Sequence, residues 1–399
     1  MWKERVLADP GEAFLRELTK PLFLVTLALL MLLSNVVGHL WFFEYPGLKS
    51  LDVFAASSLA KPAAYAQIVT VDSKDYQNYF GGISPLNGDK LGCAIRKIFE
   101  LGPAVVVVDF DTLSTQVPRH EAFGERAVWA RGATVGEDGR LDPLPILDNR
   151  LEDPPMWGLA LVPEDRDGTI REFARYIESS DGRWLPSLHW AAAEAFCRVT
   201  SAACQYLPTN GKSGDKSTLD PAVFHRRYTF QTLRLRNFVA PSSDRSQACM
   251  GVWGSKKAPD DNPLRGKLVF LGGSYALSDR QPTPFGMMNG VEIAANAVEA
   301  EFDPAKPGLI SVLVRLSVEI LLAVIVAAVH HYLQPRYALV ATMLVLVAAI
   351  FFGSFVVFYV GSYRASFAPL VVGIWIEQLF ESAERAHKLE RRSLGTGVH

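Results

Sequence analysis

The feature that most constrains this chain is the placement of its long uncharged runs near its two ends. The first run, residues 21–43, contains no Asp, Glu, Lys or Arg, and about 20 apolar helical residues cross a hydrocarbon core of about 30 Å. A cleaved signal peptide is the competing interpretation. Against it, the run is too long for the apolar region of such a peptide, and it ends in Trp41, Phe42 and Phe43 where small residues are required. We therefore expect a retained membrane helix.

Three further apolar runs crowd the C-terminal end of the chain. They predict membrane helices over residues 309–333, 337–361 and 365–380. The linkers between the runs are short, so consecutive runs are expected to form antiparallel hairpins. Together with the first run they predict a bundle of four transmembrane helices, one before the central segment and three after it.

Basic residues flank both ends of this predicted bundle. Segment 1–20 contains Lys3, and segment 381–399 contains Lys388. Positively charged flanks stay on the cytoplasmic side, and an even number of spans places both termini on one side. We therefore expect a multi-pass protein of a bacterial cytoplasmic (inner) membrane, with both termini cytoplasmic and residues 44–306 in the periplasm or outside the cell.

The segment between the spans alternates strand and helix patterns. A β-branched run begins at Ala66, and a helix pattern with Leu91, Ile95 and Ile98 on one face follows it. The continuous valine run at residues 105–108 suits a parallel strand covered on both faces. Later, KLVFLGGSY has the pattern of a buried strand, and GVEIAANAVEAEF predicts a helix. The sequence therefore predicts a three-layer α/β domain with a mixed, partly parallel sheet.

Five segments follow one another along the chain: SLDVF, IVTVDSKDY, GPAVVVVDFDTL, EDRDGTIREF and LRGKLVFLGGSYALSDRQPTPFGMMNGVEIAANAV. Taken in this order, they resemble the CHASE2 family of extracellular sensory domains. The last is the most specific, because a strand, Gly-Gly, Asp, Thr-Pro and Gly-Val-Glu-Ile-Ala-Ala occur in a fixed order. The resemblance covers roughly residues 45–300. It implies a sensory module with one span before it and usually three after it, and it implies dimers.

The end of the chain departs from that family. Its members usually continue into a cytoplasmic output domain such as a kinase or a nucleotide cyclase. Here residues 381–399 alone follow the last predicted span, and so short a segment buries no core. If the chain is complete, its signal passes to another protein. If it is truncated, the output domain has been removed, and both alternatives stay open.

Three functions from different classes are considered. The leading hypothesis is a non-enzymatic membrane-anchored sensor or scaffold that lacks its own output domain and signals through, or assembles with, partner proteins. The alternative is a structural subunit of a larger bacterial envelope complex, in which the exported domain binds protein. The third hypothesis, a small transporter, rests only on charges in the predicted spans.

Three aspartates follow predicted buried strands: Asp72, Asp109 and Asp111. The carboxyl ends of parallel strands are where open α/β sheets usually bind ligands. Carboxylates that converge there coordinate a cation through their oxygens or contact a ligand. The competing interpretation is that they cap helices or hydrogen-bond loop backbone.

Gly272, Gly273 and Ser274 follow another predicted strand. Such a turn resembles a phosphate-cradling loop, but the lysine and the glycine spacing of a P-loop are missing. Glycines that let a tight turn pass close to the sheet are the favoured interpretation. Asp279 is assigned in the same way, to loop geometry or to the rim of a ligand site.

No pattern in the sequence supports catalysis or a resident metal. Asp165 and Asp167 precede Gly168, but the further ligands of a calcium loop are missing, so a β-turn with positive φ at Gly168 is predicted. His189 lies in an amphipathic helix pattern and is interpreted as a core or surface residue and not as a base. We expect no enzyme activity, no cofactor and no metal. The net charge of -2 gives no reason to expect nucleic acid as a partner.

All four cysteines fall in the predicted exported segment, where an oxidising compartment permits disulfides. Cys197 and Cys204 are about two helical turns apart, so a bond between them requires the helix to end first. A bond from Cys249 to either of them is equally compatible. Cys93 lies in a helix pattern and is interpreted at least as readily as a buried free thiol.

Polar residues within the predicted spans indicate contacts inside the bundle. Arg315 and Glu319 are about one helical turn apart and can pair, and Asn35 and His39 suit hydrogen bonds between helices. A proton or ion path is the alternative. The expected partners are the lipid bilayer and either a second copy of the chain or other subunits of a membrane complex, with an unknown small-molecule ligand.

Overall fold

The computed structural model describes the central part of the chain and a few positions near its C-terminal end. The described residues are 41–118, 120–136, 140–147, 156–200, 207, 222–223, 226–239, 262–275 and 279–303, with single or paired positions between 317 and 348. The chain divides into two compact units, Met1–Phe54 with Pro307–His399, and Ala55–Lys306. We call the second unit the α/β domain. Among the described residues, no helix combines the length and the apolar character that crossing a membrane requires.

A six-stranded sheet forms the centre of the α/β domain, and its strands are parallel throughout. Their order is β13 (Thr232–Arg234), β2 (Ala66–Val71), β14 (Leu268–Gly273), β3 (Val105–Asp109), β4 (Ala127–Arg131) and β7 (Trp157–Leu159). All six residues of β2 are buried. Apolar, largely β-branched side chains on both faces explain this position, because a parallel strand is covered by helices on each side.

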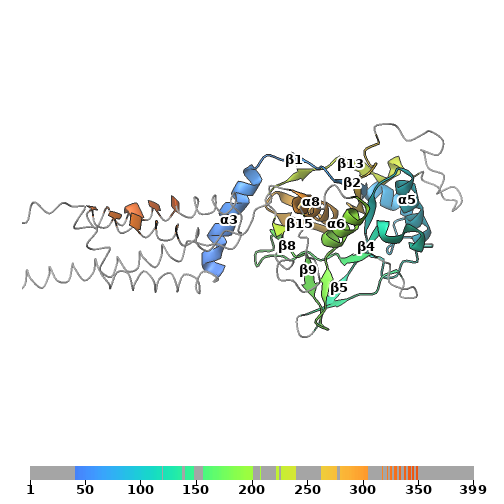
Figure 1. Cartoon of the computed structure of the whole chain (residues 1–399), viewed down its shortest axis with the longest axis horizontal. Coiled ribbons are helices and arrows are strands. Elements are labelled where there is room, and N and C mark those ends of the chain that lie inside the picture. The colour runs from blue at the N-terminus through green and yellow to red at the C-terminus, as the bar shows by residue number, and fades with distance from the viewer. Residues whose placement is uncertain are drawn as a thin grey trace, which may run out of the picture. The chain divides into compact units, whose positions relative to one another are not determined.

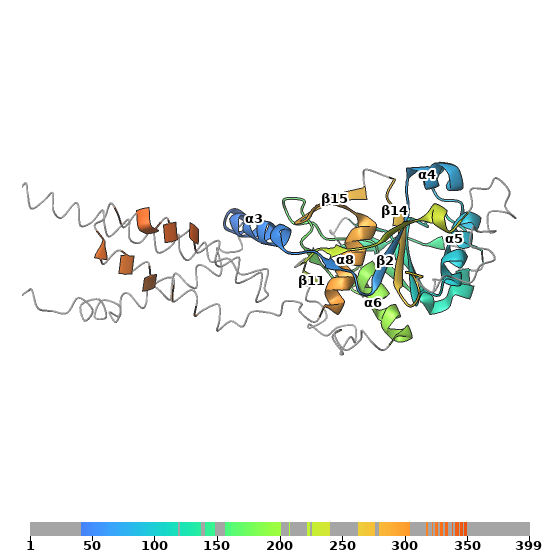
Figure 2. The same ribbon diagram turned by 90° about the horizontal axis from the view of Figure 1, so that it is seen from above.

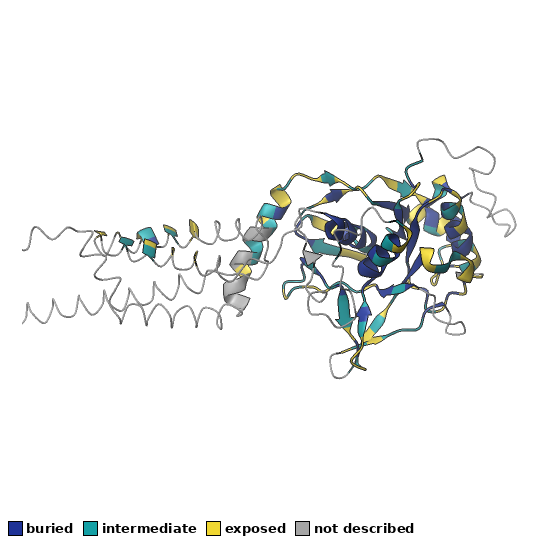
Figure 3. Ribbon diagram, viewed as in Figure 1, coloured by how far each residue is buried: buried dark blue, intermediate teal, exposed yellow. Residues whose placement is uncertain are grey.

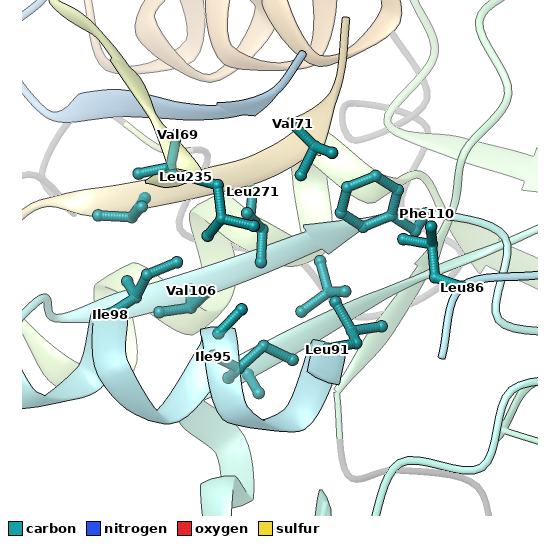
Figure 4. Close-up of a cluster of buried hydrophobic side chains, with 14 of the residues drawn as sticks. Val69, Val71, Leu86, Leu91, Ile95, Ile98, Val106, Phe110, Leu235 and Leu271 are labelled. Atoms are coloured by element: carbon teal, nitrogen blue, oxygen red, sulfur yellow. The ribbon is translucent and has the colours of Figure 1, made fainter. Parts of the chain in front are cut away.

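One face of the sheet is covered by α5 (Gly88–Glu100), as Figures 1 and 2 show. Leu91, Ile95 and Ile98 on its inner face belong to the same buried cluster as Val106 and other strand residues (Figure 4). Two residues flanking the helix set its ends. The Asn87 carboxamide oxygen accepts the backbone N–H of Lys90 at 3.1 Å, and Gly102, at φ 75°, follows its last turn. The helix therefore begins at a side-chain cap and ends at a glycine with positive φ.

The opposite face is covered by α6 (Leu188–Val199) and α8 (Gly290–Phe302), which pack against each other (Figure 2). Their side chains join Ile68, Val107 and Phe270 in a second buried cluster. α8 is buried almost all round, whereas α5 keeps an exposed outer face (Figure 3). A helix buried on every side must find buried partners for its charged residues.

The remaining described elements are five small sheets and several further helices. Four two-stranded pairs are antiparallel: β5 (Ala133–Val135) with β6 (Leu141–Pro143), β8 (Glu172–Phe173) with β11 (Ala222–Val223), β9 (Tyr176–Glu178) with β10 (Trp184–Pro186), and β15 (Arg280–Thr283) with β16 (Gly286–Asn289). β1 (Lys61–Pro62) pairs in parallel with β12 (Tyr228–Thr229). The helical pieces are α3 (Trp41–Ser57), α4 (Ser73–Asp75), η1 (Tyr76–Phe80), η2 (His120–Arg126) and η6 (Leu235–Asn237). The predicted α/β class is confirmed, with antiparallel pairing confined to the small sheets.

Each of the two cysteines among the described residues takes part in a disulfide bond. They are Cys93 in α5 and Cys197 in α6. The two other cysteines, Cys204 and Cys249, lie outside the described residues. The interpretation of Cys93 as a free thiol is therefore wrong, because burial in a helix face does not distinguish a thiol from a half-cystine.

Candidate functional site

Three neighbouring strands bring predicted site residues to one edge of the sheet. β2, β14 and β3 lie side by side and run parallel, so their carboxyl ends meet there. Asp72 directly follows β2, Asp109 is the last residue of β3, and Gly272 is in register with both Thr70 and Asp109. The predicted position of these residues is confirmed. We call the ends of these three strands, with the residues directly after them, the strand-end edge.

The two carboxylate oxygens of Asp72 bind backbone N–H groups and an arginine side chain. One carboxylate oxygen accepts the N–H groups of Lys74 at 2.9 Å and Asp75 at 3.0 Å, which caps α4, and the other pairs with Arg236. Burial opposes ionisation of Asp72, but the hydrogen bonds from Asp75 and Arg236 outweigh it and lower the pKa of this carboxyl. The capping interpretation of Asp72 therefore describes what the structure shows.

Asp111 also serves the loop and not a shared site. Its carboxylate accepts the N–H of Leu113 at 2.9 Å, a local turn, and its side chain is exposed. The three aspartates therefore do not converge on one point. In the part of the chain that the structure describes, no group of three or more His, Cys, Asp or Glu side chains is arranged to hold a metal ion.

Asp109 instead lies close enough to Asp279 to be affected by its charge. Burial raises the pKa of the Asp109 carboxyl to about 7, and the negative charge of Asp279 adds to the shift. Burial also raises the pKa of Asp279, against a hydrogen bond from the Gly290 N–H that lowers it. The carboxylate of Asp109 makes no hydrogen bond to a described residue, although Asp109 retains some contact with solvent. Burial therefore favours the protonated form of Asp109 over that of an exposed aspartate.

Two glycines allow α8 to begin directly against this pair. A Cβ at Gly272 would lie 2.6 Å from a methyl carbon of Val291 and 3.4 Å from the Cβ of Asp109. A Cβ at Gly290 would lie 2.8 Å from a carboxylate oxygen of Asp279, whose other oxygen accepts the Gly290 N–H at 3.3 Å. A side chain at Gly272 would push the start of α8 from the sheet, whereas one at Gly290 would displace the carboxylate of Asp279.

The Gly-Gly-Ser turn follows the favoured structural interpretation. The N–H of Ser274 donates to the carbonyl of Val71 at 2.9 Å, so it extends the ladder between β14 and β2. Gly273 lies against Tyr275, where a Cβ would come within 2.9 Å of the ring. The contacts of this turn are therefore made to the protein itself. This geometry gives no support to the alternative of a phosphate-cradling loop.

Aromatic and cationic residues that the sequence reading missed complete the strand-end edge. Tyr76 and Tyr275 stack with ring centroids 4.2 Å apart and planes 6° from parallel. Burial raises the pKa of Tyr275, and the nearby Tyr76 and Asp279 add to the shift. Arg236 contacts the ends of β2 and α4 through Asp72 and Asp75. Each of these residues comes from a loop or a short helix, where periodicity gives no signal.

Glu299 and Asp303, at the far end of α8, bind the segment that leads into the sheet. Glu299, 2% exposed, accepts the three consecutive N–H groups of residues 64–66 at 3.0, 2.6 and 2.6 Å. Asp303 accepts the Lys61 ammonium at 3.2 Å and the Tyr228 hydroxyl at 2.6 Å. We call Glu299, Asp303 and their partners the α8 tether.

A buried ion pair lies beside the tether. The Arg175 guanidinium donates to both oxygens of Glu301 at 2.6 and 2.8 Å, and Glu301 is fully buried. A signal for these acids was present in the sequence. GVEIAANAVEAEF is apolar on all sides and carries only negative charges, so a buried helix with buried cationic or N–H partners was implied.

Other predicted residues lie away from the strand-end edge. Gly168 has φ 72° and sits in the predicted turn, and the fully buried Arg171 pairs with Asp165 at 2.7 Å and with Asp167 at 2.9 Å. An arginine therefore occupies the place that a calcium ion would need. His189 is a buried core residue of α6, as one of the predicted alternatives states.

The polar residues predicted inside the membrane bundle lie outside the described residues. They are Asn35, His39, Arg315 and Glu319. The structure therefore leaves the predicted pairing of Arg315 with Glu319 as a prediction.

The comparisons with known proteins agree with this architecture. Residues 23–329 match the CHASE2 domain. Searches among curated proteins and among solved structures gave no match. The family match covers more than half of the chain and includes every strand of the central sheet. This chain therefore belongs to the CHASE2 domain family of extracellular sensory domains.

Proposed function

We propose that this protein is a membrane-anchored, non-catalytic sensor whose α/β domain lies outside the cytoplasmic membrane and signals to a partner protein. One observation carries the proposal. α8 begins against the strand-end edge, at Gly290, and ends in the α8 tether, at Glu299 and Asp303. A helix of this length spans about 20 Å, so one rigid element joins the place where such sheets bind ligands to the segment leading into the sheet.

The hydrogen bonds of the α8 tether suit it to transmit a movement of α8 to residues 64–66. Three N–H groups on one buried carboxylate fix the segment 64–66 to α8, and breaking a buried charged contact costs about 3–5 kcal/mol. A shift of α8 therefore moves this segment with it or breaks the contact outright. Interfaces of this kind have two discrete arrangements and do not deform continuously.

Export is supported by the family and by the cysteines. Cys93 and Cys197 are disulfide-bonded, and disulfides persist in oxidising compartments outside the cytoplasm. The proposed topology has cytoplasmic termini and four spans. Reporter fusions at Gly211 and His399 test it directly, since the two fusions must report different compartments. The same compartment for both contradicts the proposed topology.

The transmission step is tested in the full-length protein by Gly272→Ala. The added Cβ, 2.6 Å from Val291, displaces the start of α8. We expect faster hydrogen exchange of the amides at residues 64–66, relative to those of β3, by mass spectrometry. Gly158→Ala is the matched control, because its Cβ would strike the start of α6 at Leu188 and not α8.

The outcome separates coupling from general loosening. If Gly272→Ala leaves residues 64–66 as protected as Gly158→Ala does, α8 does not connect the two ends and the proposal fails. A ligand search follows the same readout. A small molecule sensed at the strand-end edge has to change exchange both there and at residues 64–66 in the unsubstituted protein, and only at the edge in Gly272→Ala.

The alternative of a structural envelope subunit has no observation specific to it. Large exposed apolar side chains such as Leu59, Ile83 and Val135 come from three separate segments of the described residues. The charges on which a transporter rests lie outside the described residues. We propose that the sensor works as a dimer or within a membrane complex, because helices transmit movement against a second subunit. Full-length protein that stays monomeric in mild detergent across a concentration series contradicts this.

A further inference from the structure

Acidic and basic residues lie at opposite ends of the parallel strands of the α/β domain. Asp72, Asp109 and Asp111 lie at the strand-end edge, where strands finish. Lys267 directly precedes β14, and Arg126 directly precedes β4. Because the strands are parallel, residues that precede them gather at the opposite edge of the sheet. Basic residues therefore collect where the strands begin.

Lys267 and Arg126 belong to one continuous row of contacts. The Lys267 ammonium donates to the carbonyl of Ala64, just before β2, at 2.5 Å, and the Lys267 carbonyl accepts the N–H of Ala104, just before β3, at 2.9 Å. The Arg126 guanidinium donates to the carbonyls of Pro103 at 2.5 Å and Ala104 at 3.1 Å. The row therefore crosses the beginnings of β2, β14, β3 and β4, a width of about 14 Å at the usual spacing between strands.

Further cations adjoin this row. Arg265 is exposed and stands two residues before Lys267. Arg227 is also exposed; it directly precedes β12, and its carbonyl accepts the N–H of Lys61 at 3.0 Å. We call the cations at this edge the amino-edge face: Lys61, Arg126, Arg226, Arg227, Arg265 and Lys267.

The acids at this edge are buried and are fewer than the cations. Lys61 and Arg226 share one buried carboxylate, that of Asp303, at 3.2 and 3.8 Å. Glu299 is also buried, and it accepts three backbone N–H groups. The other four cations of the amino-edge face form no ion pair with a described residue, since their printed partners are carbonyl groups or none.

Two exposed acids next to the face have cations of their own. Glu100, the last residue of α5, pairs with Lys97 at 2.9 Å, and Glu125 pairs with Arg198 at 3.4 Å. Within the part of the chain that the structure describes, the amino-edge face therefore carries positive charge that no neighbouring carboxylate neutralises.

We propose that the amino-edge face binds the headgroup phosphates of anionic lipids in the membrane that anchors the chain. The inference rests on the proposed function, which places the domain outside a membrane and leads its chain ends into spans. Asp303, which binds Lys61, stands six positions before the predicted span at residue 309, and six residues of chain reach at most about 20 Å. The chain therefore keeps the face within reach of lipid headgroups.

The cations of the row are held in a form that suits a phosphate. Lys267 uses one of its N–H donors on a carbonyl and Arg126 uses two, so each has further donors. Arg126 also lies over the ring of Phe99, 5.1 Å from its centroid, which fixes the guanidinium before a ligand arrives. Carbonyl and ring partners leave the positive charge in place, and phosphate oxygens accept the remaining N–H groups.

The test uses the full-length protein in bilayers of equal parts phosphatidylcholine and phosphatidylglycerol. A photocrosslinking residue replaces Thr229, an exposed residue of β12 beside Arg227, and mass spectrometry counts the lipid adducts. We expect phosphatidylglycerol adducts to exceed phosphatidylcholine adducts about fivefold or more, the contribution of one cation near an anionic surface. The same residue in place of Lys74, exposed beside the strand-end edge, should give no lipid adduct.

Two substitutions test the charge of the face. Arg227→Gln combined with Arg265→Gln removes two exposed cations whose side chains form no ion pair with a described residue. The preference for phosphatidylglycerol at Thr229 should fall at least about fivefold. Arg234→Gln combined with Arg280→Gln is the matched control, because it removes the same charge from the end of β13 and the start of β15. It should leave the preference unchanged.

A salt series needs no substitution and therefore does not depend on how a variant folds. Raising the salt from about 0.1 M to about 1 M shortens the screening length from about 10 Å to about 3 Å. The preference for phosphatidylglycerol in the otherwise unsubstituted protein should fall with it. A preference that does not respond to salt overturns the inference.

The other outcomes separate this inference from the proposed function. Equal adducts of the two lipids, no lipid adduct at Thr229, or an equal loss in both double variants overturns lipid recognition. So does a protein adduct in place of the lipid adduct in native membranes. In each case the proposed function stands if fusions at Gly211 and His399 still report different compartments; fusions that report the same compartment contradict it directly.

Discussion

Replacing His189 by Asn is expected to remove much of the acid sensitivity of the α/β domain. His189 is buried, its Nδ1 lies 3.1 Å from the hydroxyl of Ser187, and its Nε2 has no hydrogen-bond partner among the described residues. Burial lowers the pKa of this imidazole to about 4, with the Glu301 carboxylate raising it and the Arg175 guanidinium lowering it. Asn keeps a polar group facing Ser187 and does not titrate.

The size of the effect follows from the two pKa values. His189 has a pKa of 6.5 in the unfolded chain and about 4 in the folded domain. Between these values the unfolded chain binds a proton that the folded domain does not, so the stability from His189 is complete above pH 6.5 and falls as the pH drops to 4. The difference of about 2.5 units corresponds to about 3 kcal/mol of unfolding free energy.

The assay is urea unfolding of the full-length protein in mild detergent, read by hydrogen exchange of β2, β3 and β14 peptides. The difference in unfolding free energy between wild type and His189→Asn should change by about 3 kcal/mol from pH 7 to pH 4, in favour of the variant. Packing losses from the smaller side chain are the same at every pH and cancel in this comparison. A difference that stays constant to within about 1 kcal/mol refutes the reasoning, since His189 is then not held neutral by burial.

Three further outcomes are expected. Arg171→Met removes the hydrogen bonds of a buried guanidinium to Asp165 and Asp167 and should cost about 1.5–3 kcal/mol in the same assay; a loss below about 1 kcal/mol contradicts these contacts. Peptide mapping without reduction should find no bond between Cys93 and Cys197, because α5 and α6 cover opposite faces of the sheet, and a peptide that joins them disproves this arrangement. Glu319→Gln should lower the yield of folded protein less than Glu319→Leu, which strands Arg315 in the predicted bundle; equal yields argue against their pairing.

Local pattern was enough for the strands and helices of the core. The continuous valine run of β3 and the one apolar face of α5 are each contained in full within a short stretch of sequence. The strand that lies between β2 and β3 is different. It is β14, which comes from far along the chain, and no local pattern states which strand a parallel strand pairs with.

For the candidate site, too, the sequence predicted one part of the arrangement and not the other. Asp72 and Asp109 were correctly expected at strand ends, since a strand pattern also defines where the strand stops. What each carboxyl does there depends on residues distant in sequence: Arg236 pairs with Asp72, and the charge of Asp279 adds to the rise that burial causes in the pKa of Asp109. The stack of Tyr76 on Tyr275 likewise joins two loops that only the folded sheet brings together.

The α8 tether also bears on how such a domain moves between proteins. Glu299 and Asp303 join the start of the domain, residues 61–66, to its last helix, so the two ends of the domain meet inside its own fold. A module whose ends meet is inserted into a host chain without spreading the host apart. Recombination can therefore graft the domain into a turn between two helices of an unrelated protein, or delete it and close the gap with a short linker, while the flanking helices keep their spacing.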